Sequence, residues 1–198
     1  MVESENSAQT TAGRIIAEGH RLIMSRGYNG FSYADVAEAV GIRKASIHHH
    51  FAAKGDLAVA VVETSRAIIN AQMEQMAASE ADAADQLRIY VRYWERCIIE
   101  GAAPFCVAAM LAAEMPSLPE NVASAVRAHF GDLRKWLAGV LAAGVRQGGV
   151  ALTGTPEDEA DGFMSAIYGA MLTARAFSDP ARFAAIVETL LSRVLAFP

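Results

Sequence analysis

The 198-residue sequence contains only two cysteines, Cys97 and Cys106, too few for a disulfide framework. It has no apolar run of about 18 residues without a charge, which argues against a transmembrane helix. Its first residues are acidic and polar, and they lack the basic and apolar regions of a signal peptide. From these absences we expect a cytoplasmic protein whose thiols are reduced.

Motifs of the common enzyme classes are also missing. The sequence has no phosphate-cradling glycine loop, no nucleophile elbow, no H-E-x-x-H and no pair of cysteines with metal-ligand spacing. We therefore expect a protein that is not an enzyme and that needs no cofactor. Two alternatives stay open: an enzyme whose catalytic residues meet only in the fold, and a helical scaffold or co-regulator that binds other proteins.

Charge is unevenly distributed along the chain. The net charge at pH 7 is −5, which at first argues against binding to nucleic acid. Residues 1–60, however, hold six Lys/Arg and six Asp/Glu together with four of the five histidines, so the acidic excess lies in residues 61–198. A neutral N-terminal segment with local cations could still contact phosphates at one end of the molecule.

Alternating, β-branched stretches of strand length are absent as well, and the composition favours helix. Apolar residues make up 53% of the chain, enough for a sizeable core. We expect an all-α fold of about nine helices. The glycines and prolines that separate apolar-periodic segments place these helices at about 8–26, 33–40, 44–50, 54–78, 82–100, 104–113, 119–147, 157–177 and 180–195.

Residues 31–51 predict two short helices joined by a glycine turn. Ser32 followed three residues later by Asp35 fits a capping box, which satisfies free backbone donors at a helix start. Gly41 follows at a position where a helix end favours left-handed backbone, and a second short helix begins near Lys44. Helix, glycine turn and helix form the helix-turn-helix pattern, whose second helix enters the major groove of DNA.

The second of these helices should have an inner and an outer face. We expect Ala45, Ile47 and Phe51 to point inward, and the small size of Ala45 to let the backbone approach the groove. Lys54 opens the next helix and is expected to grip a flanking phosphate. Cationic side chains neutralise phosphates, whereas Ser and His can bond to phosphates and base edges. The predicted DNA-binding residues are Ser32, Arg43, Lys44, Ala45, Ser46, His48, His49, His50 and Lys54.

Three consecutive histidines also raise the question of a metal site. Consecutive helical residues point about 100° apart, and metal-ligand pairs on one helix prefer i,i+4 spacing. We therefore expect no metal at His48, His49 and His50, and we expect each of them to belong to a polar face.

Residues 11–62 resemble the DNA-binding region of the TetR family. The resemblance is carried by Gly27-Tyr28, Asp35-Val36-Ala37, Gly41-Ile42, Lys44, His49, Phe51 and Lys54. Two positions depart from the family pattern: His48 stands where a phosphate-contacting Tyr is usual, and Ala53 replaces the usual capping Ser.

The resemblance implies a specific organisation. Residues 1–53 would form a three-helix DNA-binding head, and residues 54–198 a larger body for ligand binding and dimerisation. The protein would be a homodimer that binds a palindromic double-stranded operator, with half-sites about one or more helical turns apart. The resemblance also implies a repressor that a small molecule of unknown identity releases from DNA.

The sensing residues are expected in the middle helices, with helix 54–78 as the lever to the head. Cys106 would lie near a helix N-terminus, which can lower the pKa of a thiol. The segment that begins at residue 105 also resembles a TetR subgroup with a cysteine at this point, and some members of that subgroup respond to electrophiles. The open alternatives are that both cysteines are buried core residues and that sensing uses an apolar pocket. His129 and Arg92 are candidate polar anchors of such a pocket, and each is expected to be exposed rather than to bind the ligand. The candidate sensor residues are Trp94, Phe105, Cys106, Met110 and His129.

The last two expected helices carry small and apolar residues at helical spacing, and the family pairs these helices across a dimer interface. The predicted interface residues are Phe163, Ala166, Ile167, Ala170, Met171 and Ala174.

Overall fold

The computed structural model describes residues 10–79, 82–100 and 105–196, which form nine α-helices and one short 3-10 helix. The elements are α1 (Thr11–Arg26), α2 (Tyr33–Val40), α3 (Lys44–His50), α4 (Lys54–Ser79), α5 (Ala83–Glu100), α6 (Val107–Ala112), η1 (Met115–Ser117), α7 (Glu120–Gln147), α8 (Pro156–Phe177) and α9 (Ala181–Val194). An isolated antiparallel bridge joins Val150 and Leu195, and the described residues contain no other strand pairing. None of the described helices is long and apolar enough to span a membrane.

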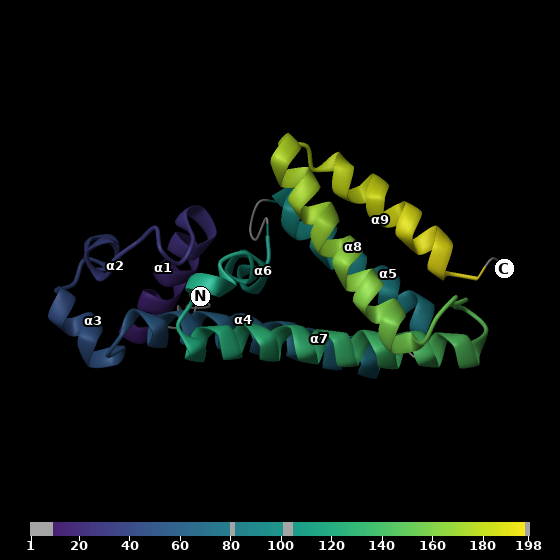
Figure 1. The fold of residues 1–198 in the computed structure, drawn as a ribbon, viewed down its shortest axis with the longest axis horizontal. Coiled ribbons are helices and arrows are strands. Elements are labelled where there is room, and N and C mark those ends of the chain that lie inside the picture. The colour runs from purple at the N-terminus through teal and green to yellow at the C-terminus, as the bar shows by residue number, and fades with distance from the viewer. Residues whose placement is uncertain (1–9, 80–81, 101–104, 197–198) are drawn as a thin grey trace, which may run out of the picture.

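The molecule is elongated, with α1, α2 and α3 at one end (Figure 1). The two long helices α4 and α7 lie side by side and run from this head into the body, where α5, α8 and α9 pack. The chain enters α4 directly from α3. Any change in the direction of α4 would therefore move the head relative to the body.

The all-α fold class is confirmed, and two helix predictions, 33–40 and 44–50, match the structure at both ends. Most other helices begin or end within a few residues of expectation. The expected start at residue 104 lies outside the described residues, and α6 is observed from Val107. The helix η1 was not expected: the Pro116 ring lacks a backbone N–H and therefore favours one tight turn over a longer helix there.

Two apolar cores support the two ends of the molecule. The head core gathers side chains of α1, α2 and α3, and also Leu57 and Val61 of α4 and Leu111 of α6. Gly19 permits this contact because a Cβ there would lie 3.2 Å from the Leu57 side chain. The boundary that we expected at residue 53 stays a prediction, and the packing of the head continues across it into α4.

The body core gathers α5, α7, α8 and α9 around fully buried side chains such as Leu137 and Phe183. This core also contains five of the residues expected at the dimer interface: Phe163, Ile167, Ala170, Met171 and Ala174. Those five side chains pack inside their own chain, so their prediction as interface residues is wrong. The apolar periodicity marks the inner face of α8, because periodicity alone does not distinguish packing within a chain from packing between chains.

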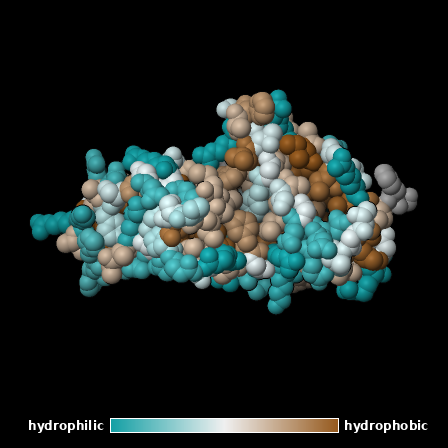
Figure 2. Space-filling model, in the orientation of Figure 1, coloured by the Kyte–Doolittle hydropathy of each residue, from teal (hydrophilic) through white to brown (hydrophobic). Residues whose placement is uncertain are grey.

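The outer face of α8 has a different character. Its exposed positions recur at helical spacing and are mostly small: Gly162, Ser165, Gly169, Leu172 and Ala176. A Cβ on Gly162 or on Gly169 would meet nothing within 4 Å. Figure 2 shows apolar side chains gathered over α8 and α9 on the viewed side of the molecule.

Candidate functional site

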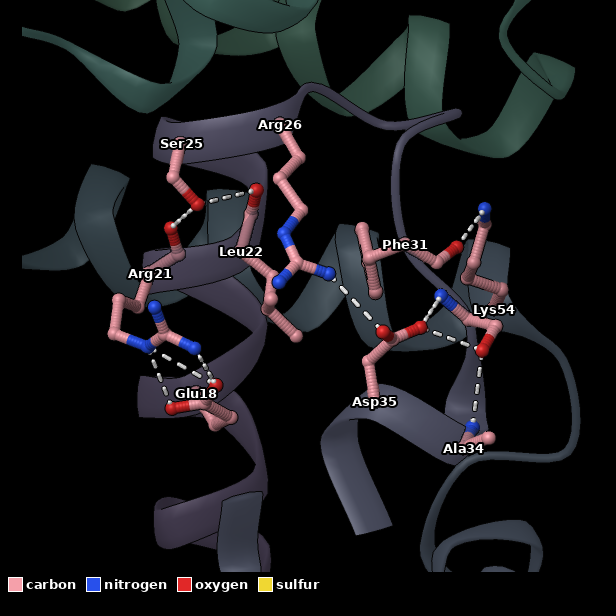
Figure 3. Close-up of polar contacts among 10 residues, drawn as sticks. Glu18, Arg21, Leu22, Ser25, Arg26, Phe31, Ala34, Asp35 and Lys54 are labelled. Carbon is pink, nitrogen blue, oxygen red and sulfur yellow. Dashed lines mark hydrogen bonds and ion pairs between the residues drawn. The ribbon is translucent and has the colours of Figure 1, made fainter. Parts of the chain in front are cut away.

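The start of α2 is fixed by the capping box that the sequence predicts. The Ser32 hydroxyl accepts from Ala34 N–H at 3.2 Å, and Asp35 Oδ2 accepts from the Ser32 N–H at 2.7 Å. Arg26 Nη1 lies 3.0 Å from the other carboxylate oxygen of Asp35 (Figure 3). The Ser32 donors, followed by the Arg26 guanidinium, lower the pKa of Asp35 to about 2. The charged carboxylate thus ties α2 to both its own cap and α1.

The turn between α2 and α3 presents α3 outward. Gly41 adopts left-handed backbone (φ 74°), and its N–H bonds back to Ala37 O at 3.0 Å. In α3 only Ile47 is buried, and it anchors the helix in the head core. Ala45 is exposed, so its expected inward orientation is wrong, although exposure agrees with close approach of the backbone to a groove.

Most cationic side chains of the head form hydrogen bonds or ion pairs with other residues of the head. Arg14 Nη2 donates to Val40 O at 2.5 Å, Arg21 pairs with Glu18, and Arg26 pairs with Asp35. Arg43 and Lys44, in contrast, are exposed and have no hydrogen-bond or ion-pair partner among the described residues. The two cations left for an external anion therefore sit next to each other at the start of α3.

Lys54 is bonded inside the protein, and its expected contact with a flanking phosphate stays a prediction. Its ammonium donates to Tyr28 O at 2.8 Å and to Phe31 O at 2.9 Å, the second of which appears in Figure 3. It also lies 4.4 Å and 4.8 Å from the centroids of the Tyr28 and Phe31 rings. Burial lowers the pKa of Lys54, with Glu114 and Asp35 acting in the opposite direction. Lys54 thus holds the α1–α2 turn against α4, and its charge is directed into the protein.

The histidines of α3 differ in their surroundings, although all three are exposed. His48 Nδ1 lies 3.1 Å from Ala52 O, and its ring meets the Tyr33 ring edge-on at 4.9 Å. A carbonyl only accepts, so Nδ1 carries the proton and Nε2 remains for an external partner. His49 and His50 contact each other edge-on at 5.6 Å. Within the described ranges, no three His, Cys, Asp or Glu side chains are grouped to hold a metal ion.

A second polar cluster lies in the body, at the start of α6. Cys106 Sγ is 3.6 Å from His129 Nε2, and the Tyr168 hydroxyl is 3.7 Å from Sγ and 3.5 Å from the same nitrogen. His129 is only 2% exposed, so the expectation of an exposed anchor is wrong for this residue. Arg92 is exposed as expected. Sequence spacing could not reveal this cluster, because its members come from α6, α7 and α8.

Burial dominates the ionisation of this cluster. It raises the pKa of the Cys106 thiol, while backbone N–H groups near the start of α6 act more weakly in the opposite direction. Burial also lowers the pKa of His129, and the Arg66 charge adds to this effect. The helix N-terminus therefore does not make Cys106 a ready thiolate. At neutral pH both shifts favour a neutral thiol beside a neutral imidazole.

Two further candidates, Phe105 and Met110, lie next to this cluster. Arg175 of α8 stacks over the Phe105 ring at 5.7 Å, and its Nη1 lies 3.1 Å from Met110 Sδ. A groove of about 320 Å³ between α6, α7 and α8 is lined by Phe105, Phe130, Tyr168 and neighbours. Cys97 is half-buried, so it is less enclosed than expected. Trp94 lies deeper, buried between α5 and the rest of the body core.

Glu114 connects the body to the head, and the sequence carries no signal for this role. Its carboxylate accepts from Tyr28 N–H at 2.8 Å, and its other oxygen lies 3.3 Å from the side-chain nitrogen of Asn29. Asn29 also donates to the Ser117 hydroxyl at 2.9 Å. The segment that follows α6 thus holds the same α1–α2 turn that Lys54 holds from α4.

Comparisons with known proteins agree with this geometry. Residues 15–61 match the family model of bacterial regulatory proteins of the tetR family, and residues 83–190 match that of a tetracyclin repressor-like C-terminal domain. A TetR-family transcriptional regulator from Agrobacterium tumefaciens has 47% sequence identity and a TM-score of 0.92, with 95% of this chain and 99% of that chain covered. A TetR regulator from Legionella pneumophila has 26% identity and a TM-score of 0.85 over 95% of this chain and 99% of that chain.

A third relative is the transcriptional repressor NemR of Escherichia coli. The sequences are 24% identical over 125 residues, which are 62% of this chain and 63% of that repressor, so the alignment spans less than two thirds of its length. The crystal structure of reduced E. coli NemR has a TM-score of 0.83 at 21% identity and covers 96% of this chain and 99% of that chain.

Proposed function

The chain belongs to the TetR family of transcriptional regulators, and from this premise we propose that it is a dimeric repressor that a small molecule releases from a palindromic operator. The observation that carries DNA contact is the pair of unpaired cations, Arg43 and Lys44, on the outward face of α3. Ser46, His48, His49 and His50 add exposed polar groups to that face. They suit contacts to phosphates and base edges. Repression is supported by the likeness to NemR, which is a repressor.

The direct test is salt-dependent binding to DNA taken from upstream of the protein's own reading frame. We expect specific binding whose logarithmic dependence on salt is steep, because several phosphate contacts release counterions. An unrelated fragment of equal length is the control. Equal affinity for both fragments at every salt concentration would contradict the proposal.

We propose that the dimer forms through the outer face of α8, together with α9. The supporting observation is the run of small exposed residues on that face, in which Gly162 and Gly169 leave open space outside the backbone. Small residues allow two helices to approach closely, and a two-fold axis would pair each face with its copy. This face takes the place of the buried residues of α8 that the sequence predicted for the interface.

Release requires that the ligand favour one arrangement of the two heads over another. The polar contacts between head and body include Lys54 of α4 with Tyr28 O, Glu114 after α6 with Tyr28 N–H, and Arg175 of α8 with Met24 O at 3.2 Å. A ligand that shifts α6 or the adjoining part of α4 would therefore change the position of the α1–α2 turn. Both recognition helices must reach the groove together, so a small change in their spacing would lower operator affinity.

A second candidate for the signal is a thiol-reactive electrophile that modifies Cys106. The observation that favours it is the position of His129 Nε2 at 3.6 Å from Sγ, where it could accept the thiol proton during reaction. Iodoacetamide would then release operator from the parent and from Cys97→Ser but not from Cys106→Ser. If release persists in Cys106→Ser, the thiol is only a core residue and a non-covalent ligand is the signal.

A further inference from the structure

Three buried polar groups in the body form no hydrogen bond of normal geometry among the described residues: Tyr90 Oη, Trp94 Nε1 and Trp136 Nε1, with only a weak donor contact from Trp94 to Tyr90. Tyr90 is 2% exposed and Trp94 3% exposed. The two residues lie one turn apart on α5, so they share a helix face. The Tyr90 and Trp136 rings pack at 5.3 Å between centroids, which brings the third group in from α7.

This set has donors but is short of acceptors. An indole N–H only donates, whereas a phenol both donates and accepts. Even if the Tyr90 oxygen accepted from both indoles, its own proton would still lack an acceptor. Buried polar groups in folded proteins are almost always paired, so an unpaired set of this kind calls for an explanation.

The surroundings indicate what kind of acceptor would suit. Burial raises the pKa of Tyr90, a weak donor contact from Trp94 acts in the opposite direction, and the nearby Cys106 adds to the rise, so this interior on balance opposes negative charge. A carboxylate ligand would meet the same penalty, whereas the oxygen of a ketone or quinone-type carbonyl would not. The aromatic rings around the donors favour a flat partner.

Of the three residues, Trp136 also lines a groove at the surface. This half-buried side chain lines a groove of about 580 Å³ between α4 and α7, together with Met73, Val140 and other residues. The groove carries charges of both signs, Glu74 and Lys135, and Asp132 is already paired with Arg66 at 2.7 Å. Because the Trp136 ring packs on Tyr90, entry of a ligand from this groove would require the Trp136 indole to rotate.

We propose that Tyr90, Trp94 and Trp136 form a binding site for an uncharged, flat ligand that is held through a carbonyl oxygen. This inference rests on the proposed function and names the chemical class of the inducer. The chemistry of this site differs from that proposed for the Cys106 thiol, because no covalent bond forms or breaks when the ligand binds. The apolar walls supply affinity, and the donors select molecules with an acceptor oxygen over hydrocarbons of the same shape.

The two tryptophans of the site are the only ones in the chain, so intrinsic fluorescence reports on it directly. The probe is 9-fluorenone, and its control is fluorene, which has the same ring system without the carbonyl. We expect saturable changes in tryptophan fluorescence with fluorenone at a Kd at least about tenfold below that of fluorene, since one hydrogen bond is worth about a factor of ten. Equal affinity for the two probes, or binding of neither, would overturn the proposal.

Two variants sharpen the test. Tyr90→Phe should weaken fluorenone binding toward the fluorene value and leave the thermal midpoint of the free protein unchanged or higher, because it removes an unpaired hydroxyl. Tyr93→Phe, the same substitution one residue before Trp94, should keep the parent preference for fluorenone. A lower midpoint in Tyr90→Phe would show that its hydroxyl is already satisfied, which contradicts the proposal. Operator binding is measured separately. A protein that prefers fluorenone but binds no operator would contradict only the proposed function. A protein that binds operator without preferring fluorenone would contradict only this inference.

Discussion

Glu114 and Gly27 lie so close that a Cβ added to Gly27 would sit 2.4 Å from the Glu114 carboxylate oxygen. The close approach is what lets Glu114 reach the Tyr28 N–H at 2.8 Å. Gly27 also has φ 74° and ψ 176°, a backbone conformation that is nearly confined to glycine. The contact between the body and the head thus depends on the absence of a side chain at one position.

We therefore predict that Gly27→Ala lowers the free energy of unfolding by about 2 kcal/mol or more, from backbone strain together with displacement of Glu114. Urea denaturation measures the change. Gly131→Ala is the matched control, because Gly131 lies exposed within α7 and a Cβ there would meet nothing within 4 Å. That control should be stabilised by about 0.5–1 kcal/mol. Equal effects of the two substitutions would contradict the role assigned to Gly27.

The contrast between Lys44 and Lys54 gives a second prediction. Lys44→Ala should weaken binding to every DNA sequence and reduce the salt slope by about one, without a loss of stability, because Lys44 has no partner among the described residues. Lys54→Met should instead lower stability by about 1–3 kcal/mol, because it removes the two bonds to Tyr28 O and Phe31 O.

The measurements are urea denaturation and operator titration at several salt concentrations for both variants. Lys54→Met should keep the parent salt slope under conditions where it is folded. If Lys54→Met reduces the slope as much as Lys44→Ala does, its ammonium contacts phosphate after all.

How far the sequence predicts this molecule depends on how local each signal is. The Ser32–Asp35 capping box and the Gly41 turn involve residues a few positions apart, so both ends of α2 and α3 could be placed from sequence. Lys54, Glu114 and His129 act on partners 23 to 86 residues away. Their roles could not be predicted, because a charged or polar residue looks the same in sequence whether it meets solvent or a distant backbone group.

The capping box gives a prediction about pH. The pKa of Asp35 is lowered from 3.8 to about 2, so its contribution to stability is fully present above its ordinary value and is lost as the pH falls through about 2. Asp35→Asn should therefore be less stable than the parent at neutral pH, and the difference should shrink between about pH 4 and pH 2. Denaturation curves across this range test it. A difference that is constant down to pH 2 would rule out the charged carboxylate as its source.

The buried cluster at Cys106 leads to a prediction about thiol labelling. Because burial raises the pKa of this thiol, alkylation by iodoacetamide at pH 7 should be slow in the folded protein. Cys97 is half-buried and should be labelled first. Mass spectrometry after timed quenching gives both rates, and denaturing urea should bring them close together. Faster labelling at Cys106 in the folded protein would mean that the cluster activates the thiol despite its burial.

The last prediction concerns the outer face of α8. Leu172 is 59% exposed on this face, between Gly169 and Ala176, and a second copy would cover it in the proposed dimer. Because both copies of a two-fold interface carry the substitution, Leu172→Arg would bury two unpaired cations in it and so disfavour association. Sedimentation at micromolar concentration should show a dimer for the parent and a monomer for the variant.

Ile68→Arg is the control, because Ile68 is 52% exposed on α4, outside the proposed interface. The monomeric variant should also bind a palindromic operator more weakly than the parent, since its two heads are no longer joined. A Leu172→Arg protein that remains dimeric, or an Ile68→Arg protein that dissociates, would place the interface on a different face.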